Sequence, residues 1–223
     1  MTDNHSSQRL FQLISPSLPI GSFTYSQGLE WAFDTGWLED ADAMEQWLLD
    51  LMQTALKDLE IPVLLRLLNA WQKQDVAAIK HWNQYLIASR ESAELKQEEI
   101  NRGRAMAVIL ATLAPYDDEL KPLIASNQTS AFAYACVQWQ IDKQQACAGF
   151  IWSWIENSVL AAVKIIPLGQ TQGQLSLFRL SEHSDDIYNE ASILLDEEIG
   201  SSSFALAIAS ANHETQYTRL YRS

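Results

Sequence analysis

Apolar residues recur at intervals of three and four positions through most of this chain, and that interval places them on one face of an α-helix. The clearest run comprises Trp47, Leu48, Leu51, Met52, Ala55, Leu56 and Leu59. A second run covers Val63 to Trp71, and a third brings Ile79, Trp82 and Leu86 to one side. Segments of this kind bury their apolar faces by packing helix against helix, so the pattern predicts an all-α fold.

Polar residues at the edges of these runs predict where the helices begin. Asp42 with Glu45, in the stretch D-A-M-E, has the spacing of a capping box. Pro62 suits the first turn of the next helix, where its missing N–H would have no partner in any case. Asp75 is expected to cap the helix after that.

The most apolar segment follows Asp142, which with Gln145 is expected to cap a helix that runs to Ile165. Since this helix is apolar on most sides, we expect it to be central and buried. No stretch reaches the roughly 18 uninterrupted apolar residues of a membrane span. A later helix is predicted to begin at Ser184 and to end at Gly200. Only QLSLFRL, residues 174–180, shows the alternation of a strand.

The predicted fold is therefore a single all-α domain over residues 1–223, a bundle of roughly 8–10 helices with extended segments at both ends. Residues 1–10 are expected to be flexible, and they lack the pattern of a signal peptide. Two cysteines, Cys136 and Cys147, are too few to hold a secreted scaffold together, so we expect buried thiols and a cytoplasmic protein. The formal net charge of −13 argues against binding nucleic acid or an anionic membrane through bulk charge.

The sequence lacks the patterns of common metal and nucleophile sites. Its four histidines are scattered, at positions 5, 81, 183 and 213, and HETQY has Tyr217 where H-E-x-x-H needs its second ligand. No G-x-S-x-G nucleophile is present. We therefore predict no metal site within the chain, although a dimer could bring two copies of one histidine together.

A glycine-bearing stretch, IIPLGQTQGQ at residues 165–174, follows the long apolar segment as phosphate-binding loops do. A P-loop requires G-x-x-x-x-G-K-[ST], because backbone amides wrap the phosphates and the lysine neutralises them. Here Gln174 follows Gly173, and the next cation is Arg179. The stretch is therefore predicted to be a polar loop without a nucleotide.

A charged segment covers Ser89 to Arg104 and places Glu91, Glu94 and Glu98 on one face of a helix. Glu98 and Arg102 have the spacing of an ion pair within that helix. The segment fits the solvated face of a long helix, which the pattern alone favours. It also fits an acidic docking face or a polar cluster at a subunit contact.

Both ends of the chain carry residue types that favour docking. The strap, Ser15 to Phe33, has Pro16 and Pro19 to keep it extended and Gly21 to allow an unusual turn, and it fits either core packing or partner binding. The tail, residues 212–223 (NHETQYTRLYRS), combines arginine with tyrosine, which are enriched at protein interfaces. We expect the tail to dock, either on its own body or on a partner.

Four segments together resemble the urease accessory protein family UreF: SPSLPIGSFTYSQGLEWA, RESAEL leading to GRA, IPLGQTQGQ and HETQYTRLYRS. They occur in the family's order and cover both ends and the middle of the chain. Two departures are mild, since Ser92 stands where the family commonly has threonine and Tyr221 gives R-L-Y-R-S where it has R-L-F-R-S.

The resemblance implies an all-helical, cytoplasmic assembly factor that is not an enzyme, has no cofactor and is commonly a homodimer. Such proteins bridge the scaffold accessory protein UreD (also called UreH) and the nickel-carrying GTPase UreG, modulate the GTPase, and act on urease apoprotein so that nickel is inserted. Whether nickel passes through the chain or only past it stays open. A helical metal-dependent hydrolase and a general helical adaptor unrelated to urease are the alternatives.

The same resemblance implies a set of partner-binding residues. Strap residues shape its surface, Glu30 presents a carboxylate beside it, the glycine-bearing loop forms a polar contact surface or subunit junction, and tail residues dock on the scaffold or within the dimer. The set is Pro19, Ile20, Gly21, Phe23, Glu30, Gly169, Gln170, Gly173, Gln174, His213, Glu214, Arg219, Tyr221 and Arg222. An arginine of the tail could anchor it or complete a GTPase site in trans, and the sequence does not separate these roles.

Overall fold

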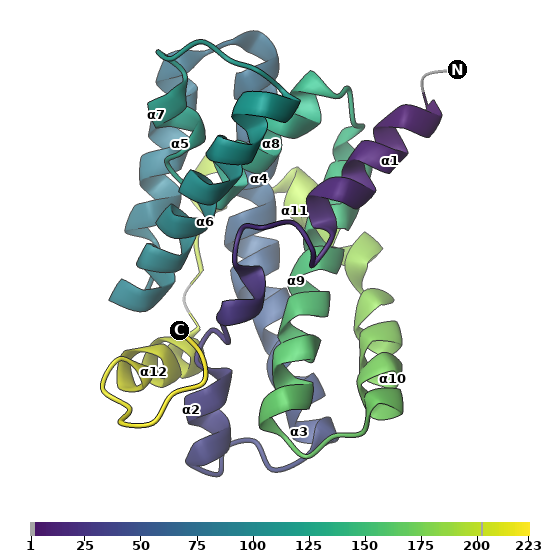
Figure 1. Cartoon of the computed structure of the whole chain (residues 1–223), viewed down its shortest axis with the longest axis vertical. Helices are drawn as coiled ribbons and strands as arrows, with labels where there is room; N and C mark the ends of the chain where they lie inside the picture. The colour runs from purple at the N-terminus through teal and green to yellow at the C-terminus, as the bar shows by residue number, and fades with distance from the viewer. Residues whose placement is uncertain (1–2, 202) are drawn as a thin grey trace.

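The computed structural model describes residues 3–201 and 203–223, and helices follow one another along the chain (Figure 1). Ten α-helices have ten or more residues: α1 (Asp3–Ile14), α3 (Ala41–Leu51), α4 (Ile61–Lys73), α5 (Val76–Ala88), α6 (Ala93–Leu113), α8 (Gln128–Gln138), α9 (Lys143–Ile165), α10 (Gln170–Ser181), α11 (Ser184–Ile193) and α12 (Phe204–His213). Short helices α2 (Leu29–Asp34) and α7 (Lys121–Ile124), 3₁₀ turns at Ser22–Thr24 and Asp196–Glu198, and a π-helix at Met52–Glu60 complete the order. No strand occurs in these two ranges, which confirms the all-α prediction.

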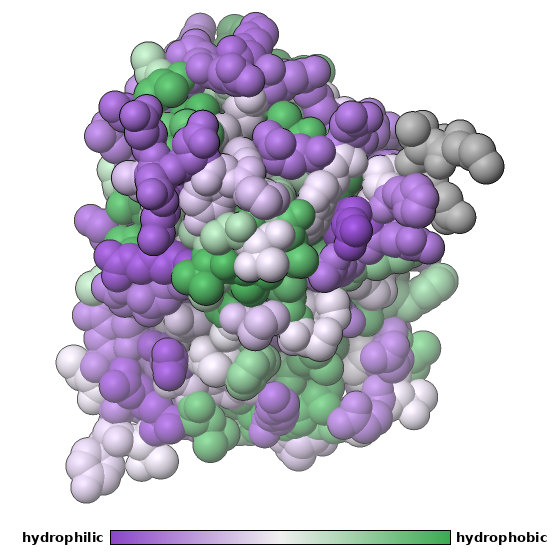
Figure 2. Space-filling model, turned by 45° about the horizontal axis from the view of Figure 1, so that its top comes forward, coloured by the Kyte–Doolittle hydropathy of each residue, from purple (hydrophilic) through white to green (hydrophobic). Residues whose placement is uncertain are grey.

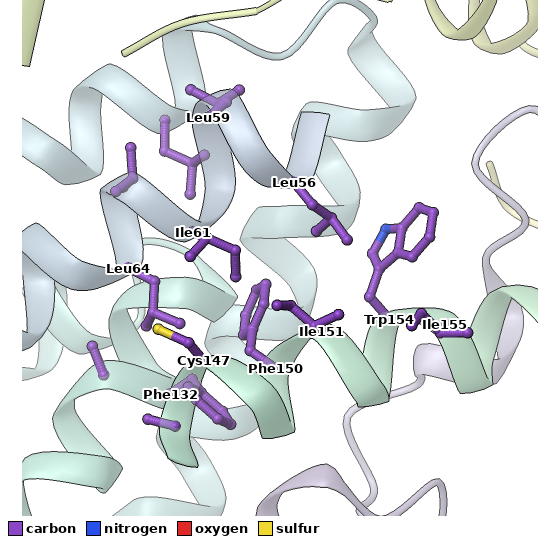
Figure 3. Close-up of a cluster of buried hydrophobic side chains, with 14 of the residues drawn as sticks. Leu56, Leu59, Ile61, Leu64, Phe132, Cys147, Phe150, Ile151, Trp154 and Ile155 are labelled. Atoms are coloured by element: carbon purple, nitrogen blue, oxygen red, sulfur yellow. The ribbon is translucent and has the colours of Figure 1, made fainter. Parts of the chain in front are cut away.

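Helices α4 and α9 form the centre of the bundle (Figure 1). Helix α4 packs against α5, α8, α9 and α11, whereas α9 also packs against α1, α2 and α10. Figure 3 shows side chains of the π-helix, α4, α8 and α9 meeting there, with the rings of Phe132 and Phe150 at 5.4 Å in an edge-to-face arrangement. Cys136 and Cys147 are both buried, as predicted, and burial raises the pKa of the Cys147 thiol to about 12.

Helix α9 confirms the prediction of a capped, central element. The Asp142 carboxylate accepts hydrogen bonds from the backbone N–H groups of Gln144 and Gln145 at 2.9 and 3.3 Å. By length and composition α9 is also the one helix within residues 3–201 and 203–223 that could cross a membrane. Its residues Phe150, Ile151 and Ile155 are buried against other helices, and a core helix of this length passes the same test.

Pro62 lies in the first turn of α4, as predicted, but that helix continues directly from the π-helix, so α3, the π-helix and α4 run on without a break from Ala41 to Lys73. Proline has no N–H to donate to the carbonyl of Asp58 four residues earlier. That carbonyl instead accepts the N–H of Gly200 at 2.9 Å, so the loop after α11 is tied to the π-helix. Asp75, by contrast, caps α5 as predicted and accepts the N–H of Ala78 at 3.0 Å.

Two predicted helix ends are wrong. Helix α3 is capped by Asp40, whose carboxylate accepts the N–H of Ala43 at 2.9 Å. Glu45 is not part of a capping box, because it binds Arg179 of α10, and this hydrogen bond lowers the pKa of the Glu45 carboxyl. Helix α11 ends at Ile193 rather than at Gly200.

An arginine from α4 accounts for the early end of α11. The guanidinium of Arg66 binds the carbonyl of Leu194 and, through Nε, the carboxylate of Asp196 at 3.0 Å. The guanidinium therefore gives the Leu194 carbonyl the hydrogen-bond donor that a backbone N–H would provide if the helix continued. The chain then leaves in a 3₁₀ turn.

Two further segments differ in secondary structure from the predictions. Residues 174–180 lie inside α10 and are not a strand, since Ser176, Leu177 and Leu180 face the core at helical spacing. Residues 3–14 form α1, whose Leu10 and Leu13 are buried, where a flexible segment over residues 1–10 was expected. Met1 and Thr2 lie outside the described residues, and flexibility there stays a prediction.

Candidate partner-binding site

The strap, the first half of α6 and the tail meet at one end of the bundle, although they are far apart in the sequence (Figure 1). Gly28 of the strap, which has a φ of +78°, lies directly against α12. A Cβ on this residue would lie 2.9 Å from the Cβ of Ala209 and 2.9 Å from the backbone nitrogen of Ser210. Only glycine therefore allows the strap to run this close to α12 in this conformation.

Glu30 of α2 anchors the tail. Its carboxylate is 4% exposed and accepts the backbone N–H groups of Leu220 at 2.7 Å and Tyr221 at 3.0 Å. The same carboxylate lies 3.2 Å from Nε2 of His213. Glu30 was expected to present its charge beside the strap, and the structure uses that charge inside the chain to hold the tail.

His213 at the end of α12 is fully buried between two carboxylates. Its Nδ1 lies 2.7 Å from Glu94 of α6, and its Nε2 faces Glu30. Each ring nitrogen therefore faces a carboxylate oxygen, which can only accept hydrogen bonds when it is ionised. Arg219 also binds Glu94, at 2.7 Å, and the ring and the guanidinium together join the tail to α6.

Glu98 of α6 makes a second anchor point, one turn further along the helix. It is 3% exposed and accepts from Arg102 at 2.7 Å, Gln27 at 3.1 Å and the Ser223 hydroxyl at 3.0 Å. The backbone carbonyl of Ser223 accepts the hydroxyl of Ser26 at 2.6 Å. Strap, α6 and tail are thus joined in one hydrogen-bond network.

The tail also completes the start of α6. Glu214 accepts the N–H groups of Ala93 at 2.9 Å and Glu94 at 3.3 Å, which are among the donors that a helix leaves unpaired at its N-terminus. The Ser92 hydroxyl, which caps α6 through Leu95, lies 2.6 Å from the hydroxyl of Ser210 on α12. The negative charge of Glu214 at the N-terminus of α6 is also stabilised by the helix dipole.

The face of α6 that carries Glu94, Glu98 and Arg102 is therefore covered by the tail, whereas Lys96 and Arg104 on another side of the helix are exposed. The predicted Glu98–Arg102 ion pair is confirmed, but it is buried under the tail. Sequence reasoning identified the acidic spacing on α6 and the cations of the tail separately. The acidic residues of α6 and the cations of the tail have opposite charge, and this was the signal that could have predicted their contact.

The structure brings the strap and tail residues together and leaves the glycine-bearing stretch apart. Gly169 and Gln170 lie at the start of α10, on the other side of α9 from the tail (Figure 1). Residues 166–169 of the stretch form the predicted loop, whereas residues 170–174 are the first turn of α10, where Gly173 is buried against Val163. Gln174 is exposed on the same helix.

The outer side of the strap and tail carries exposed apolar and cationic groups. Phe23 is 58% exposed, Leu220 73% and Tyr217 fully exposed. Pro19 is exposed on the strap, whereas Ile20 is buried beneath it and Gly21 adopts a φ of +77°. A pocket of about 480 Å³ opens between the tail and α6, and it is lined by Tyr25, Ala93, Glu94, Gln97, Glu98, Asn101, Glu214, Arg219 and Arg222.

A buried ion cluster beside α6 escaped the sequence reasoning. Arg90 binds Glu60 of the π-helix at 2.7 Å and also binds Glu99, and all three side chains are at most 8% exposed. Burial opposes the charge on Arg90, but the two carboxylates outweigh it and raise the pKa of the guanidinium. Burial raises the pKa of Glu60, and Arg90 acts against that rise.

Replacing Glu30 by alanine is expected to release the tail. The change leaves two backbone N–H groups and His213 without their acceptor, which costs about 2–4 kcal/mol of unfolding free energy. Hydrogen–deuterium exchange should accelerate at residues 214–223 while α9 stays protected. The matched control is Glu39→Ala, on an exposed carboxylate of the loop after α2, and it should leave exchange of the tail unchanged. Equal protection of the tail in both variants would contradict the assigned role of Glu30.

Within residues 3–201 and 203–223, no group of three or more His, Cys, Asp or Glu side chains has an arrangement that could hold a metal ion. At His213, for example, the two nitrogens face carboxylates on opposite sides of the ring, so the three groups do not converge on one point. The titratable groups of this site hold the tail in place.

Comparison with known proteins gives consistent matches over nearly the whole chain. The family described as UreF matches residues 38–181. The chain is 49% identical over 222 residues to urease accessory protein UreF of Alcanivorax borkumensis, covering 96% of this chain and 97% of that protein. It is 42% identical to urease accessory protein UreF of Alkalilimnicola ehrlichii (97% and 95% covered) and 39% identical to that of Citrobacter koseri (100% of both).

Proposed function

Because this chain belongs to the UreF family of urease accessory proteins, we propose that it is a urease maturation chaperone that bridges two other accessory proteins. The two are the scaffold protein UreD/UreH and the nickel-carrying GTPase UreG. By modulating GTP hydrolysis on UreG, the chain would couple that hydrolysis to nickel insertion into urease apoprotein. It acts as a binding protein in the cytoplasm, as a homodimer.

One observation carries this proposal. The strap and the tail, two of the segments that resemble the family most specifically, are joined through Glu30 and through the bond from Arg222 N–H to the Thr24 carbonyl, and they expose Phe23, Tyr217, Leu220 and Arg222. Aromatic and arginine side chains next to a polar, hydrogen-bonded rim are typical of protein interfaces. We propose this strap–tail surface as the contact with the scaffold protein.

A bridging protein needs a second, separate surface. The polar start of α10, with Gly169, Gln170 and Gln174 exposed, lies on the other side of α9 from the strap–tail surface (Figure 1). We propose that this region contacts another partner or the second subunit. The separation of the two regions supports simultaneous binding, because neither partner would cover the other's surface.

A binding role is favoured over catalysis by the way the site uses its charged groups. His213, Glu30 and Glu94 satisfy one another and the tail, so they offer no free general base or metal ligand. The helical metal-dependent hydrolase would need such a group. The family membership argues against a general adaptor unrelated to urease.

The proposed scaffold contact is tested by mixing purified proteins and reading complexes by size-exclusion chromatography with light scattering. The full chain, a version that ends at Ala211, and Tyr217→Ala/Leu220→Ala are each combined with the scaffold protein and then with the GTPase. We expect the full chain to form a ternary complex, the shortened chain to form none, and the double variant to bind the scaffold at least roughly tenfold more weakly.

The double variant separates contact from folding, since both side chains are exposed and their removal leaves the anchors of the tail in place. Glu39→Ala serves again as the control that should bind normally. Equal binding by all versions would remove the tail from the interface but keep the maturation role. No complex with any version would overturn the proposed function.

A further inference from the structure

A groove lies between α5 and α6, and α7 closes it at one end. Its volume is about 570 Å³. The lining residues are Asn83, Gln84, Ile87 and Ala88 of α5, Lys96, Ile100 and Arg104 of α6, and Pro122, Ala125 and Ser126 at α7. Apolar and small side chains form most of this lining, and alanines at 88 and 125 leave room for a helix to approach closely.

The charge of the groove is opposite to that of the chain. The chain has 28 acidic against 15 basic residues, yet the lining has two basic and no acidic side chains. Lys96 and Arg104 are exposed, and neither forms an ion pair or side-chain hydrogen bond with any residue in the described ranges. Unpaired cations beside an apolar surface favour a partner that brings carboxylates with its apolar side chains.

The spacing of the cations indicates the shape of that partner. Lys96, Ile100 and Arg104 follow one another every four residues, so they form one stripe on α6 with the apolar residue in the middle. The two cations are about 12 Å apart along the helix axis at 1.5 Å per residue. A helix with acidic residues seven or eight positions apart and apolar residues between them has the same span.

We propose that this groove binds an acidic amphipathic helix of a partner protein. Its apolar face packs on Ile87, Ala88 and Ile100, and its two carboxylates pair with Lys96 and Arg104. The groove is separate from the strap–tail surface, because residues 96, 100 and 104 lie about 200° around α6 from residues 94, 98 and 102. The proposal therefore stands whether or not the strap–tail surface is the scaffold contact.

The test uses three fluorescein-labelled synthetic peptides of one helical sequence. They share an alanine and leucine face, and the two positions eight residues apart are glutamate, glutamine or lysine. Fluorescence anisotropy gives the Kd of each for the full chain, and hydrogen–deuterium exchange locates the bound peptide. We expect the glutamate peptide to bind roughly 2- to 30-fold more tightly than the glutamine peptide, with protection confined to α5, α6 and α7.

The decisive comparison is with Lys96→Glu/Arg104→Glu, which should reverse the order of the three peptides. Lys96→Gln/Arg104→Gln should remove the preference without reversing it. Lys73→Glu/Lys164→Glu makes the same change in net charge at exposed positions outside the groove, and it should keep the order seen with the unchanged chain. The proposal is overturned if the Kd does not depend on the charge of the peptide. It is also overturned if the bound peptide protects a different part of the molecule from hydrogen–deuterium exchange.

A second copy of this acidic chain is the competing occupant. Light scattering distinguishes it, since reversing the charges of the groove would then change the subunit number without any peptide present. That result would replace the partner helix by a subunit contact and overturn the proposal. An unchanged subunit number together with the reversed order of affinity supports it.

Discussion

Replacing Arg90 by methionine is expected to lower the free energy of unfolding by about 3–5 kcal/mol, because the change strands two buried carboxylates. Glu60 and Glu99 lose the cation that binds them both, and the methionine chain fills similar space without a charge. The loss should be smaller at pH 5 than at pH 8, since burial already raises the pKa of Glu60 and a protonated carboxyl needs no counter-charge. Urea unfolding followed by circular dichroism at both pH values measures the difference.

The control for this variant removes the whole cluster. Arg90→Met/Glu60→Gln/Glu99→Gln has no buried charge left at these three positions, so it should recover most of the lost stability. If the triple variant is as unstable as the single one, packing rather than stranded charge is the cause. If Arg90→Met costs less than about 1 kcal/mol, the cluster does not stabilise the fold.

Replacing Gly103 by alanine is expected to cost about 3 kcal/mol or more. A Cβ on this residue of α6 would lie 2.4 Å from the backbone carbon of Asn127 and 2.7 Å from its oxygen. Asn127 cannot move aside easily, because it caps α8 through Ser130 at 2.7 Å and is bonded to Asn83 at 3.1 Å. The helices must therefore separate, and thermal unfolding should show the loss.

Gly169→Ala is the matched control, since nothing lies within 4 Å of a Cβ built there and the residue has a φ of −70°. It should lower the free energy of unfolding by about 1 kcal/mol or less, because Gly169 is the N-cap of α10 and alanine is a weaker N-cap than glycine. Equal stability of the two alanine variants would mean that α6 and α8 can part without cost. That outcome would contradict the close approach described for Gly103.

The helical segments could be predicted from the sequence because each carries its own periodic apolar face and local cap. Asp75 and Asp142 illustrate this, as each cap bonds to residues only two or three positions away. Helix ends set by distant residues were not predictable in this way. Glu45 binds Arg179 instead of forming a capping box. Helix α11 ends where the carbonyl of Leu194 binds Arg66, which lies about 130 residues earlier in the chain.

The site was predictable in its parts but not in its assembly. Strap, acidic helix and tail each carried a signal of interaction, and the resemblance to the UreF family pointed to Glu30 and His213. That these residues face one another depends on α12 packing against α2, which no local pattern encodes. The buried cluster of Arg90, Glu60 and Glu99 was not predicted, because charged residues in a sequence are normally expected to be exposed to solvent.

The distance along the chain between the strap and its anchor has a consequence for biosynthesis. Glu30 binds the N–H of Leu220, which the ribosome adds 190 residues later. At usual elongation rates the strap therefore waits roughly 10–40 s for its hydrogen-bond partners. During that interval the emerging polypeptide presents the open strap without its tail. Emergence of residues 212–223 from the ribosome is then the step that completes the docking surface.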